Sequence, residues 1–166
     1  EPRGWDTQLH DEVVFAISGQ RTERIHQWQI GHYTADVMGH AGLTLGTLRT
    51  DLSAGATVRF GTDLQDAFAP PRLRPALAPS SLYTPTQHIA AYVFVGVGGY
   101  AVARDVFLDG NTYRDSRSVD RNVWVGDVQA GAALHINSYR LAFTYVVRSE
   151  QYASQNGLQR FGAISM

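Results

Sequence analysis

The sequence predicts an all-β, antiparallel fold that crosses a membrane as a barrel, and three observations favour this class. Residues 124–136 and 139–148 alternate apolar and polar side chains. Segments of about ten residues with this alternation are typical of outer-membrane strands, whose apolar face meets lipid. Residues 92–119 read as a long, glycine-interrupted strand that continues into a polar loop. The chain also lacks the apolar run of about 20 residues that a membrane helix needs.

The two C-terminal segments show the alternation nearly without error. Side chains two residues apart in a strand share a face. The apolar face comprises Trp124, Gly126, Val128, Ala130, Ala132, Leu134 and Ile136, then Tyr139, Leu141, Phe143, Tyr145 and Val147; the other face carries Asp127, Gln129, His135, Arg140, Thr144 and Arg148. Between the two segments, Asn137 and Ser138 are short enough for a hairpin turn. A soluble sheet with one solvated face has the same period, but the Trp and Tyr residues favour a lipid–water interface.

The same pattern places about eight strands in the chain, within a range of seven to nine. A turn is expected at residues 19–22, a loop after residue 32 through Gly39, and a further turn at 53–55. Glycines at 96, 98 and 99 are expected to bend the fifth strand. The predicted strands are 8–18, 23–32, 43–52, 56–62, 88–106, 124–136, 139–148 and one that begins at Arg160.

The connection at residues 63–86 is rich in proline, which forbids a central strand and gives an extended linker. With eight strands and a periplasmic C-terminus, this long connection would lie on the periplasmic side. Barrels usually keep short turns there. The strand count is therefore expected to be wrong by one, and the region 88–120 is the expected place of the error.

Composition limits the possible functions. A chain of 166 residues is long enough for a single domain, and a net charge of −1 offers no electrostatic basis for binding nucleic acid. Cysteine is absent, which excludes disulfides, thiol catalysis and cysteine-based zinc sites.

Six short motifs occur in an order that suggests a family. They are GWDTQLHDE (4–12), GATVRFGTDL (55–64), APPRLRPAL (69–77), VFLDGNTYRDSRSVD (106–120), VGDVQAGAAL (125–134) and RSEQYASQNGLQRFGAIS (148–165). Together they resemble the outer-membrane lipid A 3′-O-deacylase family, the LpxR type, over essentially the whole chain.

The resemblance implies a monomeric barrel of about 12 strands in the Gram-negative outer membrane. It also implies calcium-dependent hydrolysis of the 3′-linked acyloxyacyl ester of lipid A, with lipopolysaccharide as substrate and outer-membrane lipids as surroundings. In such chemistry a histidine acts as general base on water, and the metal polarises the ester carbonyl.

The motifs match only the C-terminal portion of the family. Residues 1–166 are therefore expected to be a single domain that forms the C-terminal part of a barrel and is truncated at both ends. The family's catalytic Asn-Asp pair and histidine lie before the motif that begins at Gly4. The fragment alone is expected to be inactive, with two open strand edges that hydrocarbon does not tolerate.

Residues near the N-terminus are candidates for a supporting role. Gln8, His10 and Glu12 share one face of the first predicted strand. Amide and carboxylate oxygens suit calcium, so Gln8 and Glu12 could support the catalytic residues or the metal. The alternative is that all three are ordinary polar residues facing the lumen. The six histidines share no ligand-like spacing, and no metal site is identifiable in this chain.

Residues 109–121 raise two further possibilities. Asp109 and Asn111 have the spacing of a calcium loop, but Gly110 is misplaced for one, so a tight turn is favoured. Arg114, Arg117 and Arg121 could bind lipid A phosphates or could pair with Asp115 and Asp120. Ser80 and Ser81 lack the frame of a serine hydrolase.

Two other functions remain open at this stage. The first is a non-catalytic barrel, a structural protein or a small pore, in which Arg59, Asp127, Gln129 and Arg140 face the lumen. The second is a soluble β-sandwich that binds a partner, which would stay in solution without detergent. An Asn-Asp pair and a histidine upstream would favour the enzyme.

Overall fold

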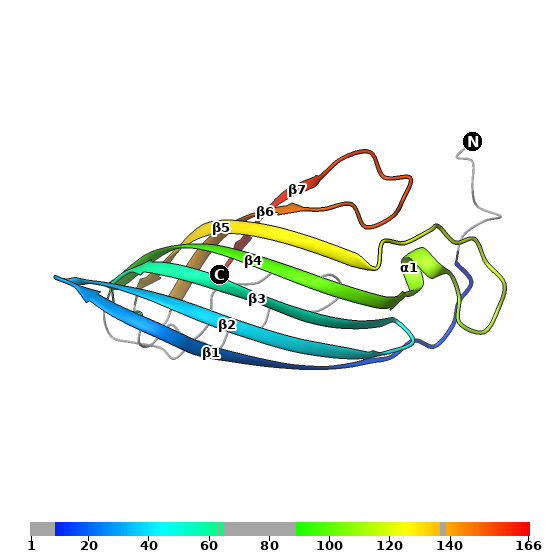
Figure 1. Ribbon diagram of the computed structural model, residues 1–166, viewed down its shortest axis with the longest axis horizontal. Helices are drawn as coiled ribbons and strands as arrows, with labels where there is room; N and C mark the ends of the chain where they lie inside the picture. Colours follow the sequence, from blue (N-terminus) through cyan, green and yellow to red (C-terminus); the bar gives the residue numbers. More distant parts are fainter. Residues whose placement is uncertain (1–8, 63, 65–88, 137–138) are drawn as a thin grey trace.

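The computed structural model describes residues 9–62, 64, 89–136 and 139–166, and these form one antiparallel sheet of seven strands (Figure 1). The strands are ordered in the sheet as in the sequence, and each pairs with the next. Figure 1 shows them as a curved wall, so the predicted all-β antiparallel class is confirmed. The strands are β1 (Ala16–Ile30), β2 (Tyr33–Gly46), β3 (Arg49–Gly61), β4 (Ile89–Asp105), β5 (Trp124–Ile136), β6 (Tyr139–Arg148) and β7 (Gln159–Ser165).

The wall has two distinct ends. We call the end where β1 meets β2 at Gly31 the turn end, and the opposite end, where β4 leads into the 106–123 connection, the loop end. One short helix, α1 (Val106–Asp109), begins that connection; the Asp105 side chain accepts a hydrogen bond from Phe107 N, and Gly110 follows with a φ of 85°. Among the described residues, no helix is long and apolar enough to span a bilayer.

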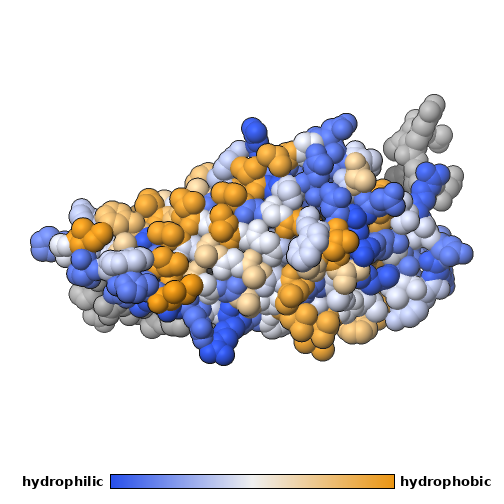
Figure 2. All heavy atoms as spheres, in the orientation of Figure 1, coloured by the Kyte–Doolittle hydropathy of each residue, from blue (hydrophilic) through white to orange (hydrophobic). Residues whose placement is uncertain are grey.

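The alternation predicted for β5 and β6 is confirmed, with the predicted bounds. Val128 on the outward face is 50% exposed, whereas its neighbours Asp127 and Gln129 on the inward face are 7% and 3% exposed. Figure 2 shows apolar side chains gathered over the strands, with hydrophilic residues near α1. Polar groups inside and large apolar groups outside reverse the usual order of a water-soluble sheet.

The first part of the sheet corrects the predicted strand bounds. A single strand, β1, replaces the predicted strands 8–18 and 23–32, and the predicted turn at 19–22 lies within it. Residues 9–15 are not in a strand, so His10 and Glu12 do not lie on a strand face as predicted. The predicted loop before residue 43 belongs to β2, and the chain turns at residues 47–48 rather than at 53–55. Among the described residues the count is therefore seven, one fewer than the main prediction and within the expected range, and the error lay before residue 62 rather than between 88 and 120.

Two features of β1 explain the error. Its outward face carries the charged residues Arg21 and Glu23, so apolar and polar residues do not alternate along this strand. A β-bulge between Arg24 and His26 also shifts the register, so outward residues are odd-numbered before it and even-numbered after it.

Correcting the count does not move the proline-rich connection relative to the C-terminal strand. In either count, four antiparallel strands follow that connection. The connection leaves the end of β3 and enters β4 at the turn end, and four strands later β7 also ends at the turn end. Apart from Leu64, which is buried, the connection lies outside the described residues, and so do Ser80 and Ser81.

Candidate functional site at the loop end

The N-terminal segment lies against the 106–123 connection, which is distant in sequence. His10 N donates to Asn111 Oδ1 at 2.9 Å, and Asn111 Nδ2 donates to His10 O at 2.8 Å. This reciprocal pair uses the backbone of His10 and leaves its imidazole exposed. Because Gly110 adopts a positive φ, the chain can turn sharply enough to present Asn111 to the segment.

The Glu12 carboxylate is the second anchor. It accepts hydrogen bonds from Thr112 N at 2.9 Å to each oxygen, and from Tyr113 N at 3.4 Å. Partial removal from water raises the pKa of the Glu12 carboxyl, but these backbone bonds and the Asn111 and Thr112 side chains lower it more. The net result is a pKa below the ordinary value of 4.5.

Two arginines fix the connection to the wall. Arg104 donates to Thr47 O at 3.2 Å, to Gly110 O at 3.3 Å and to Thr112 Oγ1 at 3.0 Å. Arg121 pairs with Asp109, whose other oxygen accepts from Asp105 N at 2.8 Å. Arg121 therefore uses Asp109 rather than the expected Asp115 or Asp120. Residues 109–111 form the C-terminal end of α1, with Gly110 as its cap, rather than the tight turn that the sequence favoured.

A nearly buried ion cluster lies beneath α1. Arg49 Nε is 2.6 Å from Asp51 Oδ2, and Arg49 Nη1 is 2.9 Å from Asp105 Oδ2. Asp105 also caps α1, so the cluster links β3, β4 and the helix. Such a cluster is costly to break, because loss of one partner leaves a charge desolvated.

The remaining predicted site residues have different positions. Gln8 lies outside the described residues. Arg114 and Arg117 are exposed and, within the described chain, have no hydrogen bond or ion pair. The same connection carries the large exposed side chains of Phe107 (66%) and Tyr113 (70%). Cationic and aromatic groups are therefore both exposed along the connection. We call these four residues the loop-end patch.

The described residues do not fit a calcium ion. Calcium takes six to eight oxygen ligands, whereas the carboxylates of Glu12 and Asp109 are already held by backbone N–H groups and Arg121. In the described part of the chain, no three His, Asp or Glu side chains come together as a metal site. In this structure the Glu12 carboxylate holds the connection through these backbone hydrogen bonds, and a supporting role beside a metal stays a prediction.

The inward face carries charged groups that sequence reasoning identified only in part. Arg59, Asp127 and Gln129 are buried there as expected, and Arg140 is half-buried, with Nη2 2.9 Å from the Tyr92 hydroxyl. Asp36, in the segment predicted as a loop, was missed; it accepts from Arg59 Nε at 2.8 Å and lies 3.1 Å from Arg24 Nε. Arg148 pairs with Asp127 at 3.0 Å.

Comparison with known proteins gives a consistent result. The whole chain, residues 1–166, matches the sequence model of a family described as outer membrane protein LpxR. The fold is similar to that of LpxR from Salmonella typhimurium, with a TM-score of 0.80 and 18% sequence identity. This similarity covers 95% of this chain and 53% of the other, so this chain spans about half the length of that protein. No curated protein sequence matches the chain.

Proposed function

Because this chain belongs to the LpxR family of outer membrane proteins, we propose that it forms part of a lipid A deacylase. The reaction is hydrolysis of the 3′-linked acyloxyacyl ester of lipid A. Water adds to the ester carbonyl, the acyl group leaves as a carboxylic acid, and the sugar hydroxyl is restored. Lipopolysaccharide in the surrounding outer membrane is the substrate.

The observation that supports this proposal best is the loop-end patch. Lipid A combines anionic phosphates with acyl chains, so a surface that recognises it needs cations beside apolar groups. The guanidinium groups of Arg114 and Arg117 are exposed and make no hydrogen bond or ion pair with the described residues. A planar guanidinium group can donate two parallel hydrogen bonds to two oxygens of one phosphate. Tyr113 and Phe107 provide aromatic surface suited to the lipid–water interface.

Within this proposal Glu12 and Asn111 are positioning residues. Their hydrogen bonds hold the N-terminal segment and the connection together, which sets where the loop-end patch lies relative to the wall. The general base and the calcium ligands belong to residues outside those described here. Calcium dependence follows from the family resemblance alone.

The first test is mass spectrometry of lipid A from Gram-negative cells that express the reading frame containing this chain, with and without calcium. Loss of a 3′ acyloxyacyl group only in the presence of calcium is the expected result. Unchanged lipid A, with the protein confirmed in the outer membrane, would favour a non-catalytic barrel instead.

A second test addresses the patch. Replacing Arg114 and Arg117 together by Ala is expected to lower kcat/KM for lipid A at least about tenfold, because each charge-assisted hydrogen bond contributes about 1.5–3 kcal/mol. Asp115→Ala, an exposed neighbour of opposite charge, is the matched control and should not lower it. Equal activity of the double variant and the wild type would remove the two arginines from substrate binding.

A further inference from the structure

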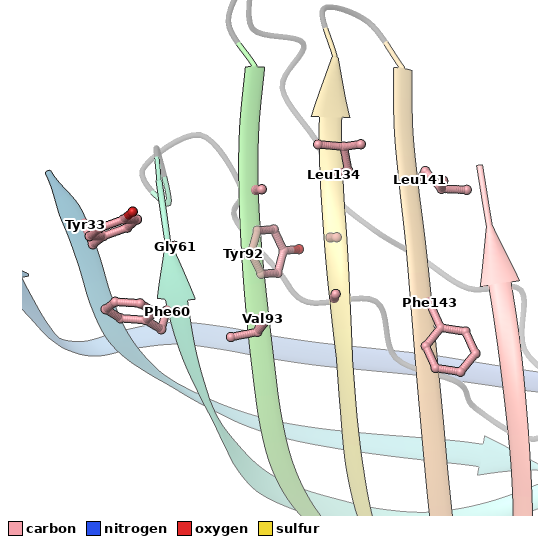
Figure 3. A pocket seen from close by; sticks show the side chains of 11 residues that line it. Tyr33, Phe60, Gly61, Tyr92, Val93, Leu134, Leu141 and Phe143 are labelled. Carbon is pink, nitrogen blue, oxygen red and sulfur yellow. The ribbon is translucent and has the colours of Figure 1, made fainter.

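A groove lies on the outward face of the wall near the turn end, away from the loop-end patch. Its volume is about 610 Å³, within the range of about 300–1,000 Å³ that single bound ligands occupy. Figure 3 shows Tyr33 and Phe60 at one side and Phe143 at the other. Eleven residues line it: Tyr33, Phe60, Gly61, Ala91, Tyr92, Val93, Ala132, Ala133, Leu134, Leu141 and Phe143.

Strand register explains why a hollow forms here. Across the outward face, Val93 pairs with Ala132, and Ala132 pairs with Phe143. The short Ala132 side chain therefore lies between two larger ones, and Ala91 occupies a similar place on β4 beside Leu134. Gly61, at the end of β3, adds no side chain to the lining.

The walls of the groove are large and ordered. Tyr33 and Phe60 stack with ring centroids 5.4 Å apart and an interplanar angle of 27°. Leu141 and Phe143 on β6 form the opposite side, and both are about half exposed. Stacked rings lose little freedom when a ligand binds, because they are already held by each other.

The chemistry of the lining restricts the occupant. The lining holds no charged side chain, and its polar side-chain groups are the hydroxyls of Tyr33 and Tyr92. Tyr92 is buried and its hydroxyl accepts from Arg140 on the inward side, which leaves the Tyr33 hydroxyl. The phosphates of lipid A would find no cation in this lining, whereas an acyl chain needs only apolar contact.

We propose that this groove binds the acyl chain of a membrane phospholipid at the turn end of the wall. The outward face of an outer-membrane protein meets lipid, so a phospholipid chain is the molecule available to fill the hollow. Tyr33 lies where a headgroup would begin, since Tyr favours the interface. The proposal does not depend on catalytic activity and concerns a place distinct from the loop-end patch.

The test is native mass spectrometry of the complete barrel that contains this chain, purified in detergent and mixed with dioleoyl phosphatidylethanolamine, a lipid without net charge. Wild type is expected to retain one lipid per chain. Ala132→Phe should lower the retained fraction about tenfold, because the ring fills the floor. Ala130→Phe is the matched control: it lies on the same strand and outward face, between Val95 and Tyr145, outside the lining. It should retain lipid as wild type does.

Two results would overturn the proposal. One is equal retention by folded Ala132→Phe and Ala130→Phe; the other is displacement of the phospholipid from wild type by an equal amount of lipid A. If Ala132→Phe fails to fold, a phospholipid with a photoreactive diazirine in its acyl chain provides a readout on wild type. Cross-linking should then concentrate on the peptide that contains Ala132 to Phe143, and labelling spread evenly over the outward face would contradict the site.

Discussion

The Glu12 carboxylate gives a prediction that can be read from pH alone. Its pKa lies below 4.5 because hydrogen bonds from Thr112 and Tyr113 outweigh the partial loss of water. A depressed acid contributes stability above its unfolded pKa and loses it as pH falls through the folded value. Protection of the amides of Thr112 and Tyr113 in hydrogen exchange should therefore be constant from pH 7 to about 5 and decline below 4.5.

A charge-removing variant separates this effect from general acid unfolding. Glu12→Gln should reduce protection of the two amides at neutral pH and remove most of its dependence on pH. Asp11→Asn, next in sequence and exposed, is the control and should behave as wild type. If both variants exchange alike, the carboxylate does not hold the connection.

Among the elements, β3 and β4 are joined near the loop end by the cluster of Arg49 with Asp51 and Asp105. Arg49→Met should lower the free energy of unfolding by about 3–5 kcal/mol, because two nearly buried carboxylates lose their partner. The measurement is urea unfolding, in lipid vesicles, of the complete barrel that contains this chain. Arg21→Met removes an exposed pair with Glu23 and should cost about 1 kcal/mol or less. Similar losses in both variants would contradict the distinction.

How far the sequence predicts an element depends on how uniform its two faces are. β5 and β6 were predicted to the residue, because large apolar groups such as Leu134 and Phe143 alternate with polar ones without interruption. β1 was not, because Arg21 on its outward face and the bulge before His26 break the period. A bulge is a property of backbone pairing, and no local pattern reveals it.

The same limit applied to the candidate site. Glu12 was identified by its residue type and position. Its partners Thr112 and Tyr113 are about 100 residues away in sequence and donate backbone N–H groups. A pattern of side chains cannot predict such backbone hydrogen bonds. The exposure of Arg114 and Arg117 was consistent with their polar surroundings in sequence. Asp36 and Arg59 are neighbours because β2 and β3 pair in a particular register. The sequence predicted a loop around Asp36, so no strand register could be predicted there.

Considered as a whole, the molecule is a curved wall with two edges. β1 pairs only with β2, and β7 only with β6, among the described residues, so each edge presents unpaired backbone groups. Apart from charged residues such as Arg21 and Glu23, the outward face between these edges carries large exposed apolar side chains, which favour contact with lipid. Hydrocarbon offers no hydrogen-bond partner to an open strand edge, and each unpaired group costs several kcal/mol there, of order 2–7. An isolated wall is therefore unstable both in water and in a bilayer.

Residues 1–166 expressed alone with an export signal are accordingly expected not to yield a folded monomer in the outer membrane. The measurement is heat-dependent migration on gels together with protease resistance, both of which report a closed barrel. The fragment should migrate alike before and after heating and should be digested fully. The solved relative, nearly twice as long, is the control that should show both properties. A heat-modifiable, resistant monomer of 166 residues would mean that β1 and β7 find partners within this chain, and the wall would have to close on itself.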